Sequence, residues 1–273
     1  MKKSEKLTNA VLVLVLLIGL SLLLYPSFSD WWNSRVQTQA IATYTQQITK
    51  MDNEEYEKVW QSAVTYNQSL LDRPNTFTLT DEQRAAYDSE LNFANNGVMG
   101  YVEIPSIDVH LPIYHGTEET VLSVAIGHLD WTSLPTGGEN THCVISGHRG
   151  LPSARLFTDL DQLAVGDYFM LNVLDAVLTY EVDQIRIVEP QETDDLLIQE
   201  GKDLCTLVTC TPYGINSHRL LVRGHRVDNL EQAQDVRITA DAVIIEKLVV
   251  APFVLAPMLL LLLVWLMIPK RKK

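Results

Sequence analysis

The chain has 273 residues, of which 47% are hydrophobic, and it carries 34 Asp and Glu against 21 Lys and Arg, a formal net charge of −13 at pH 7. Once the terminal segments are set aside, this length suits one domain with a full core. The negative charge excludes a nucleic-acid binder, because no basic surface is available for phosphates. The charge is uneven, since lysines precede the first apolar run and "KRKK" ends the chain. The more acidic middle attracts basic groups such as lysine side chains at short range.

Two apolar runs lie near the ends of the chain, at residues 10–25 and 248–269. A helix needs about 20 apolar residues to cross a bilayer core. The second run meets this length, although Pro252 and Pro257 should kink it. The first run is shorter, but Trp31 and Trp32 extend it as an aromatic belt at the membrane interface. We therefore expect two transmembrane helices.

The lysine-rich outer flanks predict that both termini are cytoplasmic and that residues 30–245 face outward. Residues 1–33 form a membrane anchor or signal-anchor in this interpretation. A cleaved signal peptide is the alternative, although no small-residue cleavage site follows the run. Residues 229–247 are expected to be a linker, and residues 248–273 a transmembrane helix with a basic tail. A buried core helix is disfavoured there by the length of the run and by the basic tail.

Residues 34–98 are expected to form a helical extension that packs on the following domain. The segment 34–70 has few helix breakers, and its apolar residues recur at three-to-four spacing. The segment "RPNTFTLT" interrupts this pattern and reads as a loop. A second, short helix should then begin after Thr80, which can form a capping box with Gln83.

From residue 99 to 228 the pattern changes to short β-strands separated by turn signals such as "TGGEN", "VGD" and "PYGIN". The predicted strands are "MGYVEIP", "VHLPIYHG", "VISG", "YFMLNVL", "LTYEVDQIRIVEP", "DLCTLVTC" and "RLLVRGHRV". Many short strands at modest spacing predict a mainly β domain, either a closed barrel or a sandwich.

Three reactive side chains lie at the ends of these strands: His148, Cys210 and Arg219. Cys210 and Arg219 flank one short turn, so an antiparallel pair would bring them side by side. A thiol nucleophile, a histidine that protonates a leaving amine and an arginine that holds an oxyanion together suit acyl transfer through a thioester. Each residue taken alone also has a non-catalytic interpretation: a core cysteine, a surface histidine or an ion-paired arginine.

Cys143 and Cys205 each precede a candidate residue by five positions. An odd offset in a strand puts the two side chains on opposite faces, so these cysteines should point into the core or towards each other. The sequence is consistent with two alternatives for this pair, namely two buried free thiols or a cross-strand disulfide. Cys210 would then be the free thiol. The remaining histidines are scattered without metal-ligand spacing, and we expect no metal site.

The chain resembles the sortases, the cysteine transpeptidases of Gram-positive surfaces, and within them the class C, pilus-assembling group. The resemblance covers roughly residues 60–228. It rests on "TLVTCTPYGINSHRLLVRG", "HCVISGHRGLPSARLFTDLDQL", "MGYVEIPSIDVHLPIYHGT" and "GHLDWTSLPTGG". It implies a closed eight-stranded β-barrel, with Cys210 as nucleophile, His148 as general acid and Arg219 at the oxyanion. Two membrane segments suit class C.

The resemblance also implies a reaction. The enzyme would cleave an LPXTG-like sorting signal of a secreted pilin, form a thioacyl-enzyme, and transfer it to a pilin lysine as an isopeptide bond. It would act outside the cell membrane of a Gram-positive bacterium and would require no metal or organic cofactor. One alternative is a cell-wall-anchoring sortase that uses a peptidoglycan peptide amine. Another is a catalytically inactive surface binding module, although no lesion in the triad is visible.

The chain departs from class C in the lid segment, residues 73–79. Class C sortases resemble one another in a lid with an Asp-Pro-aromatic motif, where this chain reads Asn75, Thr76 and Phe77. Phe77 keeps the aromatic ring, but the carboxylate that would pair with Arg219 and the stiffening proline are absent. We therefore expect a more weakly held lid, because an exposed ion pair contributes about 0–1 kcal/mol. The alternative is that residues 73–79 only link two helices.

Overall fold

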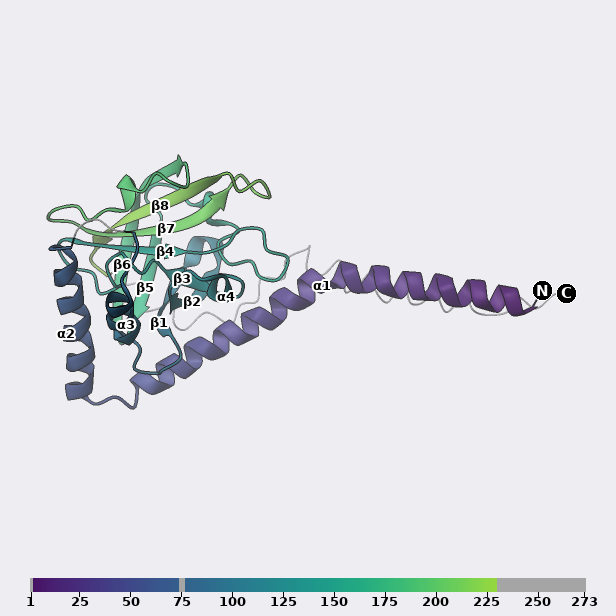
Figure 1. The fold of residues 1–273 in the computed structure, drawn as a ribbon, viewed down its shortest axis with the longest axis horizontal. Helices are drawn as coiled ribbons and strands as arrows, with labels where there is room; N and C mark the ends of the chain where they lie inside the picture. Colours follow the sequence, from purple (N-terminus) through teal and green to yellow (C-terminus); the bar gives the residue numbers. More distant parts are fainter. Residues whose placement is uncertain (1, 74–76, 230–273) are drawn as a thin grey trace.

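The computed structural model describes residues 2–73 and 77–229. Within them, eight strands close into a barrel in the order β1-β2-β3-β4-β7-β8-β6-β5 (Figure 1). The strands are β1 (Val98–Ile104), β2 (Val109–His115), β3 (Ile126–His128), β4 (Thr141–Ser146), β5 (Tyr168–Val173), β6 (Ala176–Val188), β7 (Asp203–Thr211) and β8 (His218–Val227). The prediction of a mainly β, closed eight-stranded barrel is confirmed.

The helices are α1 (Lys2–Ile48), α2 (Asn53–Leu70), α3 (Asp81–Ser89) and the short α4 (Glu119–Leu122). Figure 1 shows α1 running away from the barrel, whereas α2 stands against its opposite side. The capping box of α3 is confirmed, because the Thr80 hydroxyl accepts from the Gln83 N–H and the Thr80 N–H donates to the Gln83 side chain.

The prediction of a single helix over residues 34–70 is wrong, because two helices share this range. The helix is interrupted between Ile48 and Asn53. Residues 34–48 belong to α1, the helix that also contains the first apolar run. Asp52 begins the new helix, since its carboxylate accepts from the Glu55 N–H at 2.8 Å. An aspartate at an N-cap stabilises a helix start that apolar periodicity alone does not reveal.

Within the described residues, one helix is long and apolar enough to cross a membrane, namely α1 from Leu7 onward. Two transmembrane helices were predicted. The second predicted run, residues 248–269, lies outside the described residues, as does nearly all of the predicted linker. Of the two predicted apolar helices, the described residues therefore contain the N-terminal one.

The strands that carry the candidate residues are covered by apolar side chains on both faces. Interior positions of β4, β7 and β8 belong to the main core. Outward positions build a second cluster with neighbouring loops: Val144, Val188, Leu196, Val208 and Leu221, with Leu129 and Trp131 packed against them. Strands buried on both faces read as nearly continuous apolar runs, as "LCTLV" does. The outer cluster forms the base on which the candidate site lies.

Tyr44 fastens α1 to the barrel. Its side chain is fully buried, its hydroxyl donates to the carbonyl of Met99 at 3.0 Å, and it accepts from the N–H of Leu174 at 2.7 Å. Its ring packs against that of Phe93 with centroids 5.2 Å apart. The hydroxyl therefore satisfies two backbone groups at once where the helix meets the sheet.

We expect Tyr44→Phe to lower the free energy of unfolding by about 1–3 kcal/mol, because the N–H of Leu174 loses its acceptor inside the protein. Chemical denaturation of the full chain in detergent micelles measures this change. Thr43→Val is the control, since the exposed Thr43 hydroxyl bonds only within its own helix, to the Gln39 carbonyl. Equal effects of the two substitutions would contradict the role given to Tyr44.

Candidate active site

The three predicted residues lie at neighbouring strand ends. Cys210 and Arg219 face each other directly in the antiparallel register of β7 and β8. The parallel pairing of β4 with β7 ends at Ser146 opposite Val208, and the Gly147 N–H still donates to the Val208 carbonyl. Continuing this register by two residues sets His148 beside Cys210. Because side chains alternate along a strand, all three positions belong to the outer face of the sheet.

A hollow of about 290 Å³ lies over the outer cluster beside these strand ends. Val208 and Leu221 line its apolar side, and Arg219, Ser146 and Glu192 supply polar groups. An apolar cleft with a few polar side chains is the usual form of a site that binds an extended peptide or a small molecule. The hollow therefore offers a binding surface that ends at one of the three candidate residues.

Arg219 is held by its own turn. Its Nη1 donates to the carbonyl of His218 at 3.1 Å and to that of Asn216 at 3.3 Å. Among the described residues it forms no ion pair. The alternative interpretation of Arg219 as an ion-paired arginine therefore does not apply within the described residues. The guanidinium has five N–H donors, so it keeps donors for a carbonyl oxygen or an oxyanion in the hollow.

His148 faces a carboxylate that the sequence did not single out. Its Nε2 lies 3.6 Å from Glu119 Oε2, and the Glu119 side chain is 83% exposed. Glu119 comes from α4, 29 positions earlier, and no local motif joins the two residues. The backbone of His148 is also held, because its carbonyl accepts from the Phe157 N–H at 3.1 Å. Glu119 is therefore placed to orient the imidazole.

The loop after His148 touches the turn between β7 and β8. Gly150 has a φ of +76°, and a Cβ there would lie 2.9 Å from the ring of Tyr213. Any side chain at Gly150 would therefore strain the backbone and strike the ring. The Arg149 guanidinium lies 5.9 Å from the centre of the same ring and pairs with Asp161. These contacts join the two segments that carry His148 and Cys210.

Cys210 is partly exposed, whereas Cys143 and Cys205 are buried. The two buried cysteines are register partners on β4 and β7, and both belong to the main core. The prediction that they point away from the site is confirmed, and of the two alternatives the structure has two free thiols. Burial, together with the contact with Cys143, raises the pKa of the Cys205 thiol well above its usual value. Cys205 is therefore a protonated core residue.

Phe77 is the described residue of the motif at 75–77, and Asn75 and Thr76 lie outside the described residues. Its ring is half exposed and packs edge-to-face on Trp131, with centroids 4.9 Å apart. Phe77 and Trp131 line the hollow that Arg219 also lines. They also line a neighbouring hollow of about 490 Å³. The aromatic pair therefore stands at the border of the candidate site, and Trp131 is a further residue that sequence reasoning missed.

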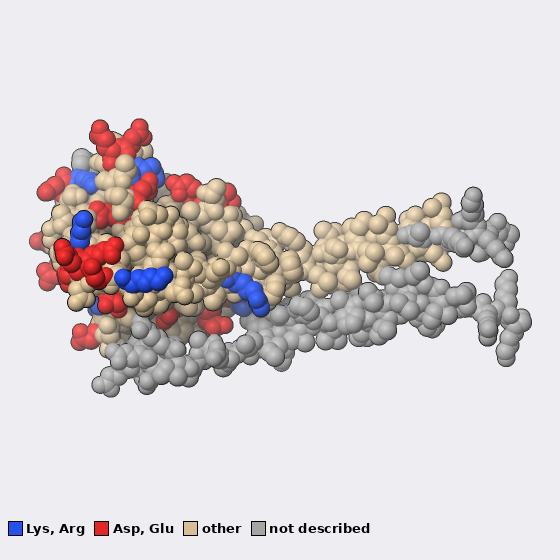
Figure 2. Space-filling view, turned by 90° about the horizontal axis from the view of Figure 1, so that it is seen from below, with Lys and Arg blue, Asp and Glu red and all other residues tan. Residues whose placement is uncertain are grey.

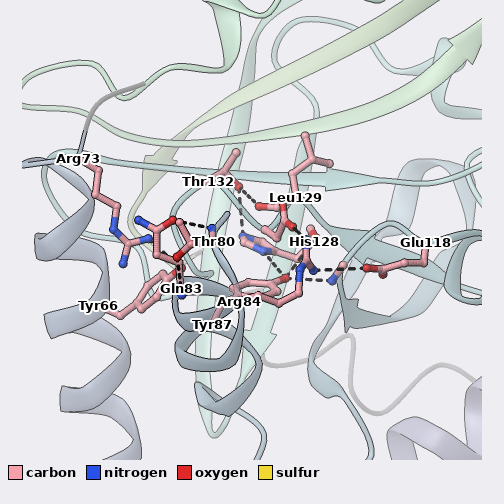
Figure 3. A network of polar contacts seen from close by, with 12 residues as sticks. Tyr66, Arg73, Thr80, Gln83, Arg84, Tyr87, Glu118, His128, Leu129 and Thr132 are labelled. Carbon is pink, nitrogen blue, oxygen red and sulfur yellow. Dashed lines mark hydrogen bonds and ion pairs between the residues drawn. The ribbon is translucent and has the colours of Figure 1, made fainter. Parts of the chain in front are cut away.

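Helix α3 fixes the segment that carries Phe77 to the barrel (Figure 3). Arg84 pairs with Asp130 and, at 3.4 Å, with Glu118. The Tyr87 hydroxyl lies 3.0 Å from His128 Nδ1 and accepts from the Gly116 N–H. The partners of Arg84 are chain neighbours of Trp131 and Glu119, so one helix positions both of the residues that the sequence did not reveal.

The buried side chain of His142 links two segments of the chain next to the candidate site. Its Nδ1 lies 2.9 Å from the Leu197 carbonyl, and its Nε2 lies 2.7 Å from the Thr206 hydroxyl. Burial lowers the pKa of His142 to about 4, although the bond to the Leu197 carbonyl acts in the opposite direction. The side chain is therefore neutral in the folded protein, and it ties β4 to the loop before β7.

We expect the protein to lose stability as the pH falls from 7 to 5. The unfolded chain protonates a histidine near pH 6.5, whereas folded His142 does so only near about 4, so the stabilisation is present above pH 6.5 and is lost on the way to 4. The share of His142 is about 2 kcal/mol between pH 7 and 5. Urea unfolding at several pH values measures it. His142→Gln should flatten the dependence, and an unchanged slope would contradict this account.

A metal-binding arrangement is absent from the described part of the chain, where no group of three or more His, Cys, Asp or Glu side chains is placed around a common point. A partly exposed thiol, an imidazole and a guanidinium at neighbouring strand ends suit acyl transfer through a covalent intermediate.

Comparison with protein families and curated relatives identifies one family. A model described as the sortase domain matches residues 102–227. Sortase D of Bacillus subtilis is 33% identical over 131 residues, which are 47% of this chain and 63% of that protein. Sortase A of Streptococcus agalactiae is 28% identical over 206 residues, 74% of this chain and 77% of that protein. The chain thus spans less than two thirds of the Bacillus relative and about three quarters of the streptococcal one.

Solved structures give a higher identity. Sortase C1 from Streptococcus agalactiae is 51% identical with a TM-score of 0.69, and the match covers 70% of this chain and 100% of that one. Sortase C of Streptococcus pneumoniae is 46% identical with a TM-score of 0.62, covering 70% and 97%. Sortase C of Clostridium perfringens, solved with the C-terminal cell wall sorting motif, is 45% identical with a TM-score of 0.63, covering 70% and 100%.

Proposed function

The chain belongs to the sortase family of cysteine transpeptidases, and we propose that it is a class C member that polymerises pilin subunits. The observation that carries the proposal is the 51% identity over the full length of a sortase C1 structure. Further support comes from the long motifs around His148 and Cys210 and from the aromatic side chain of Phe77 at the border of the site.

In the first half of the proposed reaction, the Cys210 thiolate attacks the carbonyl carbon of the Thr–Gly bond in an LPXTG-like sorting signal. The carbonyl oxygen becomes an oxyanion, which the free N–H groups of Arg219 stabilise. The C–N bond then breaks, and His148 gives its proton to the leaving glycine amine. The product is a thioester between Cys210 and the threonine carbonyl. Glu119 Oε2, 3.6 Å from the imidazole Nε2, is placed to orient the ring of His148 for this transfer.

In the second half, a lysine ε-amine of the next pilin subunit attacks the thioester carbonyl. The amine loses a proton to His148, the C–S bond breaks, and the sulfur leaves as the thiolate of Cys210. An isopeptide bond joins the two subunits, and the enzyme returns to its starting state. The chain has 34 Asp and Glu, nearly all of them in the body between the apolar runs, and this negative charge favours the approach of a lysine amine over that of an anionic acceptor.

The proposed arrangement places the barrel outside the cell membrane of a Gram-positive bacterium. Helix α1 is the apolar helix that supports an anchor at the N-terminal end. We retain residues 1–33 as the anchor, 34–98 as the helical extension, 99–228 as the catalytic domain and 248–273 as a second anchor. Both termini would then be cytoplasmic, in keeping with the basic residues that flank both apolar runs.

A cell-wall-anchoring sortase is the second candidate, because four of the five curated relatives are named sortase A. Such an enzyme would transfer the same thioacyl group to a peptidoglycan peptide amine. The two candidates share the first half-reaction and differ only in the amine that resolves the thioester. An experiment on the acceptor therefore separates them.

The deciding experiment incubates the full chain in detergent micelles with candidate pilins that carry an LPXTG-like signal. Pilus polymerisation predicts ladders that resist SDS, in which mass spectrometry finds a Thr–Lys isopeptide bond. The same mixture with a peptidoglycan stem peptide in place of the acceptor pilin tests the second candidate. Single pilin–stem conjugates without ladders would reject the polymerase proposal while keeping the transpeptidase.

The lid proposal makes a separate prediction. We expect Asn75→Asp to slow labelling of Cys210 by a small thiol reagent, because a carboxylate at this position can pair with Arg219 across the site. An exposed pair contributes about 0–1 kcal/mol, which corresponds to at most about a five-fold slower rate. Cys143 and Cys205 are buried and should not react.

Thr78→Asp is the matched control for the lid, since it adds the same charge three positions away in the same segment. Labelling rates that Asn75→Asp and Thr78→Asp change equally would reflect charge alone. Equal rates for Asn75→Asp and the natural chain would mean that residues 73–79 only link α2 to α3.

A further inference from the structure

Helix α1 bonds directly to the loop that follows His148, here called the 149–158 loop. Asn33 Nδ2 donates to the Ser153 carbonyl at 2.8 Å. Asp30 Oδ1 accepts from the Arg155 N–H at 2.9 Å. These contacts join residues more than 115 positions apart in the chain. The helix that carries the apolar run therefore contacts the loop that directly follows His148.

The contacts lie at the point where α1 leaves its apolar run. A helix rises 1.5 Å per residue, so Asn33 stands about 12 Å along the axis from Tyr25 at the end of that run. Trp31 and Trp32 are half exposed beside these contacts, and aromatic residues of this kind mark the level of lipid headgroups. If α1 crosses a bilayer, the 149–158 loop therefore lies at the headgroup layer.

The turn between β7 and β8, residues 212–217, lies on the same edge. Figure 1 shows this turn on the side of the barrel from which the N-terminal half of α1 departs. Tyr213 packs against Gly150 of the 149–158 loop, so the two segments form one surface. Tyr213 is 61% exposed and Ile215 is 72% exposed, the latter at the tip of the turn. Two large apolar side chains thus project from an edge at the level of the headgroups.

The charge of this edge differs from that of the rest of the protein. The chain carries 34 Asp and Glu, yet residues 142–158 and 204–227 contain none. Arg155, half exposed, pairs with Asp159, and Arg149 pairs with Asp161, so nearby carboxylates balance part of the positive charge. On the face seen in Figure 2, the region where α1 leaves the body carries few acidic side chains. Because the two segments that form this edge contain no acidic residue, an anionic bilayer repels them less than it repels the acidic body.

We propose that the turn between β7 and β8 docks on the outer leaflet of the membrane, with Ile215 and Tyr213 inserted among the lipid headgroups and upper acyl chains. The lipid bilayer is the occupant that the surface fits, because α1 brings this edge to the required depth and its apolar tip matches the interface. Docking fixes how far Cys210 and Arg219 lie from the membrane. It also orients the hollow along the membrane surface.

The test uses the full chain reconstituted in vesicles of phosphatidylglycerol and phosphatidylcholine. A benzophenone-bearing residue replaces Ile215, and illumination cross-links it to what it touches. The control places the same residue at Leu71, which is 51% exposed at the end of α2 on the opposite side of the barrel. Lipid adducts are counted by mass spectrometry. We expect several-fold more lipid adducts at position 215 than at 71, and more with the anionic lipid.

Equal adduct yields at positions 215 and 71 would overturn the proposal. So would adducts at 215 that appear only on an added sorting-signal peptide, since the turn would then be a peptide-binding surface. If the chain does not remain with the vesicles at all, the anchor itself is refuted and docking with it. Amide exchange gives an independent reading on Ile215→Ser. Backbone amides of residues 213–217 should exchange faster in that variant than in the natural chain when vesicles are present, and equally fast in detergent.

Discussion

Replacing Cys210 by alanine is expected to abolish both cleavage of a sorting-signal peptide and formation of linked products. Without the sulfur no thioester can form, and the remaining groups act only on a water molecule that they are not placed to activate. Loss of a nucleophile of this kind lowers kcat by about 10⁴-fold or more. Release of the glycine-containing fragment, followed by mass spectrometry, measures the first half-reaction without requiring an acceptor. The trapped thioester should appear only in the natural chain.

Cys205→Ala is the matched control for Cys210→Ala. Cys205 lies on the same strand, five positions earlier, and is fully buried in the core. Its replacement removes a thiol and leaves a small cavity, so it should lower stability by a modest amount and leave the chemistry in place. A Cys210→Ala variant that still cleaves the peptide, or one that fails only because it is unfolded, would contradict the role of the thiol. Thermal unfolding of both variants separates these outcomes.

Arg219→Lys is expected to lower kcat by about 10²–10³-fold, the loss that follows removal of one oxyanion donor. Lysine keeps the positive charge but lacks the planar fork of donors. In the structure one arm of the fork already bonds to the carbonyls of His218 and Asn216, which leaves the rest for the substrate. The single ammonium group of a lysine cannot bond to these carbonyls and to the oxyanion at the same time. Steady-state kinetics should show the loss mainly in kcat, with a smaller change in KM.

Arg223→Lys is the control for this prediction. Arg223 lies on β8 four positions from Arg219, on the same face, and its guanidinium is engaged with Asp183 at 2.8 and 3.0 Å. Its replacement should change stability and leave kcat within a few-fold of the natural value. Equal losses of kcat in the two variants would mean that Arg219 acts through the fold. Full activity of Arg219→Lys would mean that charge alone suffices.

Local sequence determined the elements of this protein whose causes lie within a few residues. The alternation of "LTYEVDQIRIV" marks a strand, and Thr80 with Gln83 marks a helix start, because both patterns arise from contacts between near neighbours. Cys210 and Arg219 could be placed together for the same reason, since one turn joins their strands. Side-chain alternation also placed Cys143 and Cys205 in the core.

Other features depended on chain segments that lie far apart. His148 comes beside Cys210 through parallel pairing of β4 with β7, whose residues are about 60 positions apart. Glu119 and Trp131 reach the site from loops that carry no motif of their own. The position of Tyr44 is also tertiary, because its hydroxyl bonds to the backbone of Met99 and Leu174, which are far away in the sequence.

By itself, then, the sequence determined seven of the eight strands, all but the three-residue β3, together with the apolar helix and the chemical types at the candidate site. Tertiary structure alone decided which of those side chains share a face and which neighbours surround them. The physical reason is the closure of the barrel. Pattern and turn chemistry act over a few residues, whereas closure pairs strands distant in sequence and leaves their ends, with the loops and with α1, on one common edge.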